Sequence, residues 1–588
     1  MMMAATMLTA TSCSEFDDYN KAVADATPSG NQTLWQNIEQ NTQLSDFAAL
    51  VKKAGFDADL SANNYYTVWA PLNNTFDPAP FQTMSKSALM QRFVKNHIAS
   101  YGHQASGKIE ERVLMLNEKS YNFTGSSSYE FDGVTLNQAN QPNSNGLLHT
   151  LNGVATFYPS IYEFITDSTL SDNKGLDSLR NFVLRYETTY LDTKHSVVGP
   201  IVNGMQTYVD SVMITENALW DNLSFKMNNE DSTYTLLAPT NEAWAKAQNK
   251  IKSNFNYIAT TSAQAFNGVN ISTKNLTSTI DNAYWQDSLT SRYLTRNLAY
   301  SNRSPYNRQL LNEKPTFSAT DSLYSTMRNK FSNPQDIINQ TKETVKMSNG
   351  FTRLMDSLAF YPWETYSPEK VISVTRSENR ARITSGNAQT ISIPYSRLDG
   401  TKINLDEQDG NALNYAFIES SSAYSKAELD VYLPNVLSTT YDIYCVFVPE
   451  NVDTAKSTAA TLPNRVVFEL NYCGADGKLA NKMFLNEDPD NIANFLKDFP
   501  TIKDNATNKN TVRGFSNDTS KVDTVYIGEF TFPVCYYGLG EGICPNLKIT
   551  TPFAASNRVL TAAFTRDFRI AAIILKPKEL VEFEEKNK

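Results

Sequence analysis

The spacing of apolar residues predicts two short helices and then a buried strand in the first part of the chain. Apolar positions recur every three or four residues at 34–38 and again at 45–53, which is the spacing of amphipathic helices. Residues 67–69 are β-branched or aromatic and suit a strand. Pro71 ends that strand, because proline has no N–H to donate to a neighbouring strand. The pattern therefore predicts mixed helix and sheet.

A second copy of this strand and turn lies farther along the chain, which indicates an internal duplication. The first copy runs from Thr67 to Asp77 and the second from Thr235 to Trp244. Both copies follow the pattern Ala-Pro-x-Asn-x-x-aromatic. The residues that carry it are Ala70, Pro71, Asn73 and Phe76 in the first copy and Ala238, Pro239, Asn241 and Trp244 in the second.

Two later motifs follow the first copy in order. The stretch 93–98 contains His97, and the dipeptide Asn145-Gly146 is followed by His149. Together with the Ala-Pro-x-Asn-x-x-aromatic stretch, these motifs resemble the fasciclin family. The resemblance implies a small β-sandwich or wedge wrapped by helices. It also implies a non-enzymatic adhesion or binding role.

The second copy resembles the family less closely. The dipeptide Asn349-Gly350 repeats the later motif, and Asp356 follows it, but Arg353 stands where the family has histidine. Asn297 lies near the position of the middle histidine. We therefore expect a second, degenerate fasciclin-like domain, with these residues in structural roles.

From about residue 369 the sequence changes to short strands separated by glycine, asparagine and proline, which is typical of an all-β, jelly-roll-like sandwich. We therefore expect two α+β fasciclin-like domains in tandem, followed by this sandwich. The predicted parts are a lipoprotein signal remnant at 1–13, a tether at 14–31, a fasciclin-like domain at 32–168, a second one with an insertion at 169–368, and the C-terminal β-sandwich domain at 369–588.

The N-terminal residues resemble the end of a bacterial lipoprotein signal. Small and apolar residues precede Cys13, and acidic residues follow it, as in lipoproteins that Gram-negative cells export to their surface. The resemblance implies an outer-membrane lipoprotein whose lipid anchor is attached to Cys13. The basic start that a secretory signal needs is missing, so a disordered acidic tail after an unprocessed start is the alternative. No apolar run of about 18 residues could span a membrane as a helix.

Charge and motifs exclude several classes of function. The net charge of −10 at pH 7 argues against a nucleic-acid partner, which needs a basic face. The sequence has no GxSxG, HExxH or Walker motif and no CxxC spacing. We therefore expect no enzyme activity, no cofactor and no metal. His97 and His149 are expected to tie strand to helix through their two ring nitrogens; binding a ligand is the alternative.

Four cysteines lie late in the chain, and two of them, Cys535 and Cys544, flank a predicted hairpin. They could form a disulfide in an oxidising compartment, or all four could be buried thiols. Tyr536 and Tyr537 on this hairpin are the candidate exposed aromatic residues for contact with a ligand such as a sugar. Packing in a core or interface is the alternative for them.

These features predict a non-enzymatic adhesion or binding lipoprotein on the cell surface. Its partner would be an outer-membrane protein, such as a nutrient importer of the starch-utilisation type, or an extracellular polymer. The loops at 250–345 and the hairpin at 535–544 would make the contact. Two alternatives remain: a polysaccharide-active or carbohydrate-binding protein that acts through the C-terminal β-sandwich, and a structural spacer of the envelope.

Overall fold

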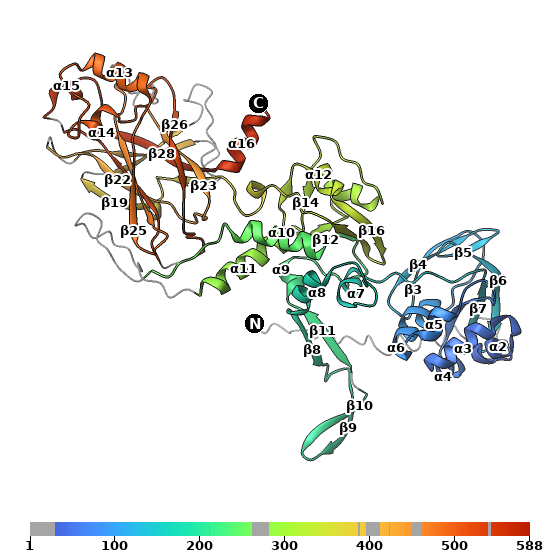
Figure 1. Cartoon of the computed structure of the whole chain (residues 1–588). Helices are drawn as coiled ribbons and strands as arrows, with labels where there is room; N and C mark the ends of the chain where they lie inside the picture. The colour runs from blue at the N-terminus through green and yellow to red at the C-terminus, as the bar shows by residue number, and fades with distance from the viewer. Residues whose placement is uncertain are drawn as a thin grey trace, which may run out of the picture. The chain divides into compact units, whose positions relative to one another are not determined.

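The computed structural model of the chain divides into two compact units (Figure 1). One contains the described residues up to Ala238 together with Tyr300–Pro315 and Lys342–Leu354, and the other contains the remaining described residues. The structure describes residues 30–210, 212–260, 281–385, 388–394, 412–420, 422, 424–449, 461–538, 542–554 and 556–588.

The first domain, residues 32–157, is built on a seven-stranded sheet in the order β2-β1-β7-β6-β5-β4-β3. β1 and β7 are parallel, with Trp69 opposite His149, and the other neighbouring pairs are antiparallel. The strands are β1 (Tyr66–Pro71), β2 (Ile98–Ser100), β3 (Ile109–Leu114), β4 (Ser120–Gly125), β5 (Tyr129–Phe131), β6 (Val134–Asn143) and β7 (Gly146–Leu151).

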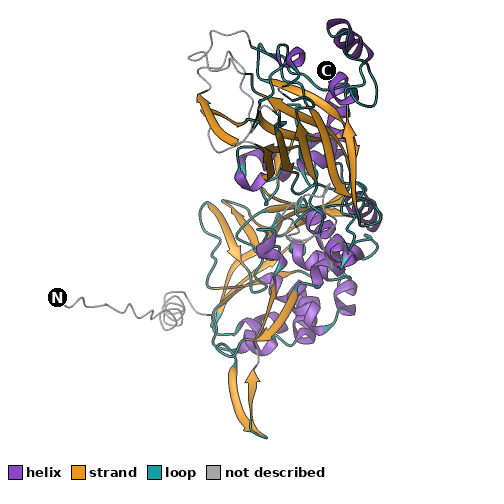
Figure 2. Cartoon of the chain, turned by 90° about the vertical axis from the view of Figure 1, so that its left-hand side faces the viewer, coloured by secondary structure: helices purple, strands orange, loops and turns teal. Residues whose placement is uncertain are grey.

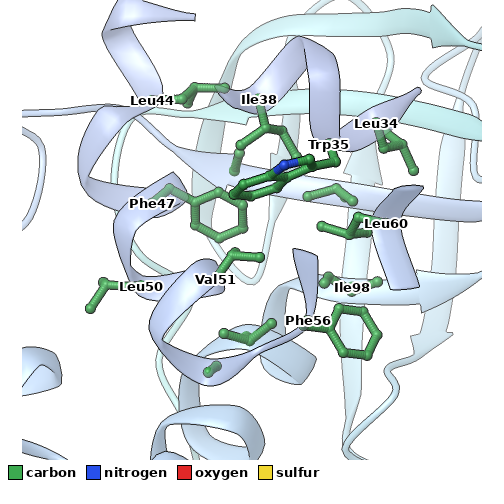
Figure 3. Close-up of a cluster of buried hydrophobic side chains, with 14 of the residues drawn as sticks. Leu34, Trp35, Ile38, Leu44, Phe47, Leu50, Val51, Phe56, Leu60 and Ile98 are labelled. Carbon is green, nitrogen blue, oxygen red and sulfur yellow. The ribbon is translucent and has the colours of Figure 1, made fainter. Parts of the chain in front are cut away.

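Short helices pack on one face of this sheet and enclose its larger core (Figure 3). Trp35 and Phe47 from the helices meet Val68 and Ala70 of β1 there. Because side chains alternate along a strand, Trp69 points to the opposite face, into a second core. The helices are α2 (Leu34–Gln40), α3 (Ser45–Ala54), α4 (Asp57–Ser61), α5 (Ala79–Thr83) and α6 (Lys86–Leu89).

The next part of the chain contains a four-stranded sheet in the order β13-β12-β17-β16. Its strands are β12 (Tyr234–Pro239), β13 (Ala299–Ser301), β16 (Thr341–Met347) and β17 (Gly350–Met355). The helices of this part are α7 (Ile161–Thr166), α8 (Asp177–Leu184), α9 (Leu219–Asn222), α10 (Asn241–Lys252), α11 (Asn282–Thr295) and α12 (Pro334–Asn339). A small ladder joins β14 (Leu323–Tyr324) to β15 (Lys330–Phe331).

Between α8 and α9 the chain forms two successive antiparallel ribbons. The first pairs β8 (Glu187–Leu191) with β11 (Met213–Asn217), and the second pairs β9 (Val197–Val202) with β10 (Met205–Asp210). We call the segment 187–217 the arm.

Strands predominate in the last part of the chain (orange in Figure 2), where two sheets form. One has the order β20-β21-β28-β23-β26, with β18 also paired to β28, and the other has the order β19-β22-β27-β24-β25. The first sheet contains β18 (Lys370–Ser373), β20 (Ala388–Pro394), β21 (Ala412–Ile418), β23 (Thr440–Phe447), β26 (Asp523–Thr531) and β28 (Phe568–Pro577). The second contains β19 (Arg380–Ser385), β22 (Glu428–Tyr432), β24 (Val467–Cys473), β25 (Leu479–Phe484) and β27 (Asn546–Thr550).

This part also contains helices, so the expectation of a purely β domain is wrong in that detail. They are α13 (Pro489–Asp498), α14 (Lys509–Val512), α15 (Arg558–Thr561) and α16 (Lys578–Lys586). Phe495 of α13 packs with Val512 and Leu560 from the next two helices in a small apolar cluster of their own. The scattered apolar residues between the strands therefore form the inner faces of short helices, which the strand pattern did not predict.

Candidate functional site

The dipeptide Asn145-Gly146 fastens the helices of the first domain to its sheet. The buried Asn145 accepts a hydrogen bond at Oδ1 from the Leu34 N–H at the start of α2 (2.7 Å). Its Nδ2 donates to the carbonyls of Leu60 (2.9 Å) and Ala62 (2.7 Å) at the end of α4. At Gly146, φ is 154° and a Cβ would overlap the carbonyl oxygen of Tyr66 in β1. Both residues therefore have structural roles.

The other motif residues of the first copy also contact its own backbone. Ala70 and Pro71 end β1. Asn73 accepts a hydrogen bond from the Asp46 N–H (3.0 Å), which fastens the start of α3. Phe76 is half-buried and packs against the large core.

His97 is a buried structural imidazole. Its Nδ1 donates to the Phe93 carbonyl (2.8 Å), and its Nε2 accepts from the Ala155 N–H (3.1 Å). Burial lowers the pKa of His97 to about 4, so the ring is neutral at pH 7.

His149 has the same kind of environment. Its Nε2 donates to the His103 carbonyl (2.9 Å), and its Nδ1 accepts from the Asn140 N–H (3.1 Å). The ring lies 5.5 Å from Trp69, which also stacks on Phe131 at 4.4 Å. Burial lowers the pKa of His149 to about 4 as well. Both nitrogens of each ring have backbone partners, so neither histidine has a ring nitrogen left for a ligand.

The later motif of the second copy makes the same contacts as the first. Asn349 accepts from the Ile161 N–H at the start of α7 (3.0 Å), and its Nδ2 donates to the carbonyls of Met227 (2.7 Å) and Asn229 (3.1 Å). A Cβ on Gly350 would overlap the carbonyl oxygen of Tyr234 in β12. The dipeptide Asn349-Gly350 thus holds a helix start to a strand.

The residues in place of the two histidines are buried and take structural contacts. Asn297 donates to the carbonyl four residues before it, Tyr293 (3.0 Å), as His97 does with Phe93. The Arg353 guanidinium donates to three main-chain carbonyls and to Thr344. Its carbonyl acceptors are those of Leu310, Asn312 and Glu313, at 3.2, 2.6 and 2.9 Å. Burial lowers the pKa of Arg353 to about 10, so it stays charged at pH 7.

The remaining motif residues of the second copy lie in or beside its sheet. Ala238 and Pro239 end β12, Asn241 begins α10, and Trp244 is buried on that helix. Asp356 directly follows β17, and its N–H donates to the Gln340 carbonyl (3.0 Å).

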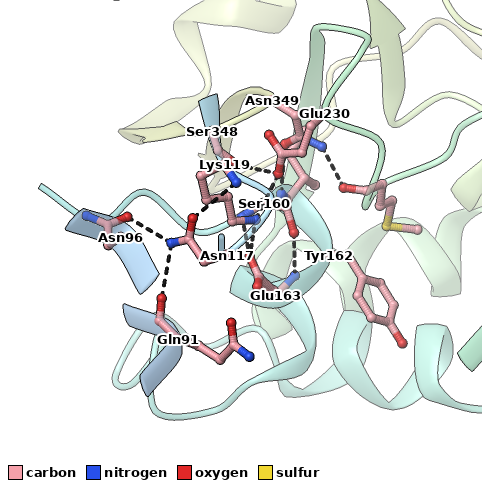
Figure 4. Close-up of polar contacts among 12 residues, drawn as sticks. Gln91, Asn96, Asn117, Lys119, Ser160, Tyr162, Glu163, Glu230, Ser348 and Asn349 are labelled. Carbon is pink, nitrogen blue, oxygen red and sulfur yellow. Dashed lines mark hydrogen bonds and ion pairs between the residues drawn. The ribbon is translucent and has the colours of Figure 1, made fainter. Parts of the chain in front are cut away.

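Lys119 is a buried cation that the sequence did not single out (Figure 4). Its Nζ contacts a carboxylate oxygen of Glu163 (2.7 Å) and one of Glu230 (2.8 Å). Glu163 also completes the capping box of α7 with Ser160, and Ser348 donates to Glu230 (2.7 Å). Lys119 thus joins the turn between β3 and β4 to residues that surround Asn349. No local motif marks it, because its two carboxylates lie 44 and 111 residues away in the chain.

Removing this cation should destabilise the fold measurably. Lys119→Met is expected to lower the free energy of unfolding by about 2 kcal/mol, because it leaves the poorly exposed Glu230 carboxylate without its cation. This expected loss is smaller than the usual destabilisation when a buried ion pair is broken, because Glu163 is 42% exposed and water can take the place of Lys119. Urea unfolding of the full chain measures the effect. Exposed Lys108→Met is the control, and equal losses in both variants would refute the assignment.

The late cysteines are free thiols in the structure, so the predicted alternative of a Cys535–Cys544 disulfide is not present. Burial raises the pKa of each of these two thiols to about 12. No ladder forms between the described residues on the two sides of 539–541. Instead, Tyr536 pairs with Val436.

Tyr536 and Tyr537 are not the exposed aromatic pair that was expected. Both are half-buried. Tyr537 packs against Phe255 (5.8 Å) and Tyr293 (6.1 Å), and its carbonyl accepts from the Tyr257 hydroxyl (2.8 Å). Side chains that lie more than 240 residues earlier in the chain therefore cover this segment, which local sequence does not reveal.

A cavity of about 250 Å³ lies between α16 and the first sheet of the last part. Tyr444 lines it, next to Tyr526 at 5.3 Å between ring centres. Lys576 in its wall contacts Glu584 (2.5 Å) and Glu369 (3.7 Å). An aromatic ring beside charged hydrogen-bonding groups suits a small polar ligand.

The remaining candidate chemistry is structural or lies outside the described residues. In the acidic loop 486–490, Asp488 caps α13 and Glu487 pairs with Arg513. In the parts of the chain that the structure describes, no three His, Cys, Asp or Glu side chains gather as metal ligands. None of the described helices has the length and apolarity to cross a membrane. Cys13 lies outside the described residues.

Comparison with known proteins gives one family match. No curated protein matches the chain. A solved FAS1 domain pair from the insect cell adhesion molecule Fasciclin I is similar at 12% identity over 55% of this chain and 99% of that chain, with a TM-score of 0.20. Residues 42–156 match the family described as fasciclin domain, and this stretch of the chain is therefore a fasciclin domain.

Proposed function

We propose that this chain is a non-enzymatic adhesion or binding protein, held at the outer membrane by a lipid on Cys13 and exposed at the cell surface. The observation that carries the adhesion role is the fasciclin match at 42–156, because that domain is generally a non-enzymatic adhesion module. The partners of His97 and His149 support it, since both rings use their two nitrogens within the fold.

We also propose a second, degenerate fasciclin-like domain. The strand order β13-β12-β17-β16 repeats the order β2-β1-β7-β6 of the first domain. Asn349 and Gly350 make the contacts that Asn145 and Gly146 make. A jelly-roll-like domain from about residue 369 completes the proposed arrangement.

The proposed boundary between the two fasciclin-like domains moves from 169 to about 159. α7 begins at Ile161 behind a Ser160–Glu163 capping box, as α2 begins at Leu34 behind one formed by Thr33 and Gln36. Asn349 holds the first N–H of α7, so this helix belongs with the second sheet.

The lipid anchor has a direct test. Labelled palmitate should enter the full-length protein in a Gram-negative host and should fail to enter Cys13→Ala. Cys445→Ala, which changes a buried thiol, is the control and should keep the label. Equal labelling of wild type and Cys13→Ala would refute the anchor.

The partner is proposed to be an outer-membrane protein, such as a nutrient importer of the starch-utilisation type, or an extracellular polymer. Recovery of the tagged protein from gently solubilised native membranes, followed by mass spectrometry, tests the first choice. A transporter in stoichiometric amount supports an importer accessory, and recovery of the protein alone refutes it.

A carbohydrate-binding role through the last part of the chain is a second candidate, and the cavity beside Tyr444 favours it. Retardation of the protein in gels that contain polysaccharide, compared with Tyr444→Ala, separates this role from binding to a membrane protein. Loss of retardation in the variant supports a sugar site, and equal mobility of both proteins refutes it.

A further inference from the structure

The outer half of the arm is a hairpin that extends away from α8 and α9 (Figure 1). Asn203 and Gly204 form its turn, with φ values of 52° and 79°. Positive φ at both central residues is typical of a type I′ turn, whose twist matches that of the paired strands. The hairpin is therefore a specified element of the fold.

This hairpin is apolar on both faces and carries no charge along 196–209. Val197 and Val198 are 55% and 62% exposed, and Ile201 and Val202 are 70% and 49% exposed. Because neighbouring residues in a strand point to opposite faces, β9 presents exposed apolar side chains on both faces of the hairpin. On the returning strand, Met205 is 71% and Val209 is 76% exposed. A two-stranded hairpin with such faces is marginal in water and needs a partner.

The two edges of the hairpin differ. β9 contains Pro200, which has no N–H to donate. β10 contains no proline, and among the described strands its sole neighbour is β9. An edge strand without proline or lysine is a template for a further strand. The free edge of the hairpin is therefore the outer edge of β10.

The dimensions disfavour a lipid bilayer as the occupant. Residues 197–202 span about 17 Å at about 3.3 Å per residue. That length exceeds the roughly 5–10 Å depth of interfacial insertion. Deeper insertion would place the edge N–H and C=O groups of β10 in hydrocarbon without partners. A protein strand satisfies both the edge groups and the apolar faces.

We propose that the occupant is the β10 strand of a second copy of this chain, paired antiparallel across a two-fold axis. The second copy supplies a strand that is uncharged from Met205 to Val209, carries the exposed apolar residues Met205 and Val209, and has a free edge. Symmetric pairing turns two marginal hairpins into one four-stranded ribbon, and three or more strands are needed for independent stability. This inference does not depend on the proposed envelope role.

The contact is small, because each copy contributes one six-residue strand and its neighbours. Interfaces below about 1,200 Å² are typical of weak or transient association. We therefore expect a monomer–dimer equilibrium that depends on concentration rather than a permanent dimer.

Sedimentation velocity of the purified full chain across the micromolar range tests the pairing. Wild type is expected to shift from 65.8 kDa towards twice that mass with concentration. The double variant Met205→Lys/Val209→Lys is expected to associate at least tenfold more weakly, because edge lysines oppose strand pairing. Leu114→Lys on β3, also an exposed apolar position at 61%, is the matched control and should behave as wild type.

Three results would overturn the proposal. Wild type could stay monomeric at the highest concentration, or the double variant could associate as strongly as wild type. Wild type could also float with phosphatidylcholine vesicles while Met205→Lys/Val209→Lys does not, which would identify lipid as the occupant. A benzophenone side chain in place of Tyr208 adds a geometric check: irradiation should give a covalent dimer, and its absence counts against the pairing.

Discussion

Acidification from pH 6.5 to pH 4 is expected to lower the free energy of unfolding of the first domain by about 3 kcal/mol for each of its two buried histidines. The pKa of His97 and that of His149 lie near 4 in the fold and at 6.5 in the unfolded chain. Between these values the unfolded chain binds more protons, so acid favours unfolding. The stabilisation is therefore complete above pH 6.5 and is lost as the pH falls towards 4.

The replacement of His97 by asparagine isolates its share of this effect. Asn297 makes the same backbone contact without titrating, so His97→Asn should fold and should lose about half of the pH dependence. Calorimetry of the full chain at a series of pH values, wild type beside variant, measures the difference. An unchanged pH dependence in His97→Asn would show that this ring does not control acid stability.

Gly146→Ala is expected to destabilise the first domain by about 4 kcal/mol, because the new methyl group meets a backbone oxygen and φ is positive. The Tyr66 carbonyl that it meets lies in β1, which pairs in parallel with β7, so neither strand can move away without loss of the ladder. Hydrogen exchange of peptides from β1 and β7 in the full chain should accelerate strongly.

Gly133→Ala separates the cost of the positive φ from the cost of the clash with the Tyr66 carbonyl. Gly133 also has a positive φ, 76°, but a methyl group added there would meet no atom within 4 Å. Its replacement should cost only about 1–2 kcal/mol, the usual cost of a left-handed conformation. If Gly133→Ala and Gly146→Ala accelerate exchange equally, close approach of β1 is not the reason for the glycine.

The residues that sequence predicted well are those that contact the backbone of their own domain. Asn145 and Asn349 can be recognised because one amide must bind the N–H of a helix start and two main-chain carbonyls at once, and a glycine must follow it. Such requirements leave a fixed local pattern. They revealed the first domain and the repeated motif, although Arg353 and Asn297 stand where the first copy has histidines.

Contacts between distant segments could not be predicted in the same way. Lys119 carries no local motif, and Tyr537 looked exposed because Tyr257 and Tyr293, which cover it, come much earlier in the chain. The turn Asn203-Gly204 closes a hairpin in the structure, but the local sequence of a hairpin does not say whether other elements will cover its faces. The alternating strands of the last part predicted its sheets. The helices α13 and α16 among them are as amphipathic as α3, with Phe495 and Val581 on their buried sides, and were not predicted from the sequence.

The hydrogen bond between Ile161 and Asn349 has a consequence for synthesis of the chain. The two residues are 188 positions apart in the chain, whereas Leu34 and its partner Asn145 are only 111 positions apart. At about 5–20 residues per second, the ribosome needs roughly 10–40 s to make the intervening segment. During that interval α7 has been made without its anchor and keeps its apolar side uncovered. A nascent chain of this protein thus exposes apolar surface until Asn349 follows, which is the stage at which a chaperone would be needed.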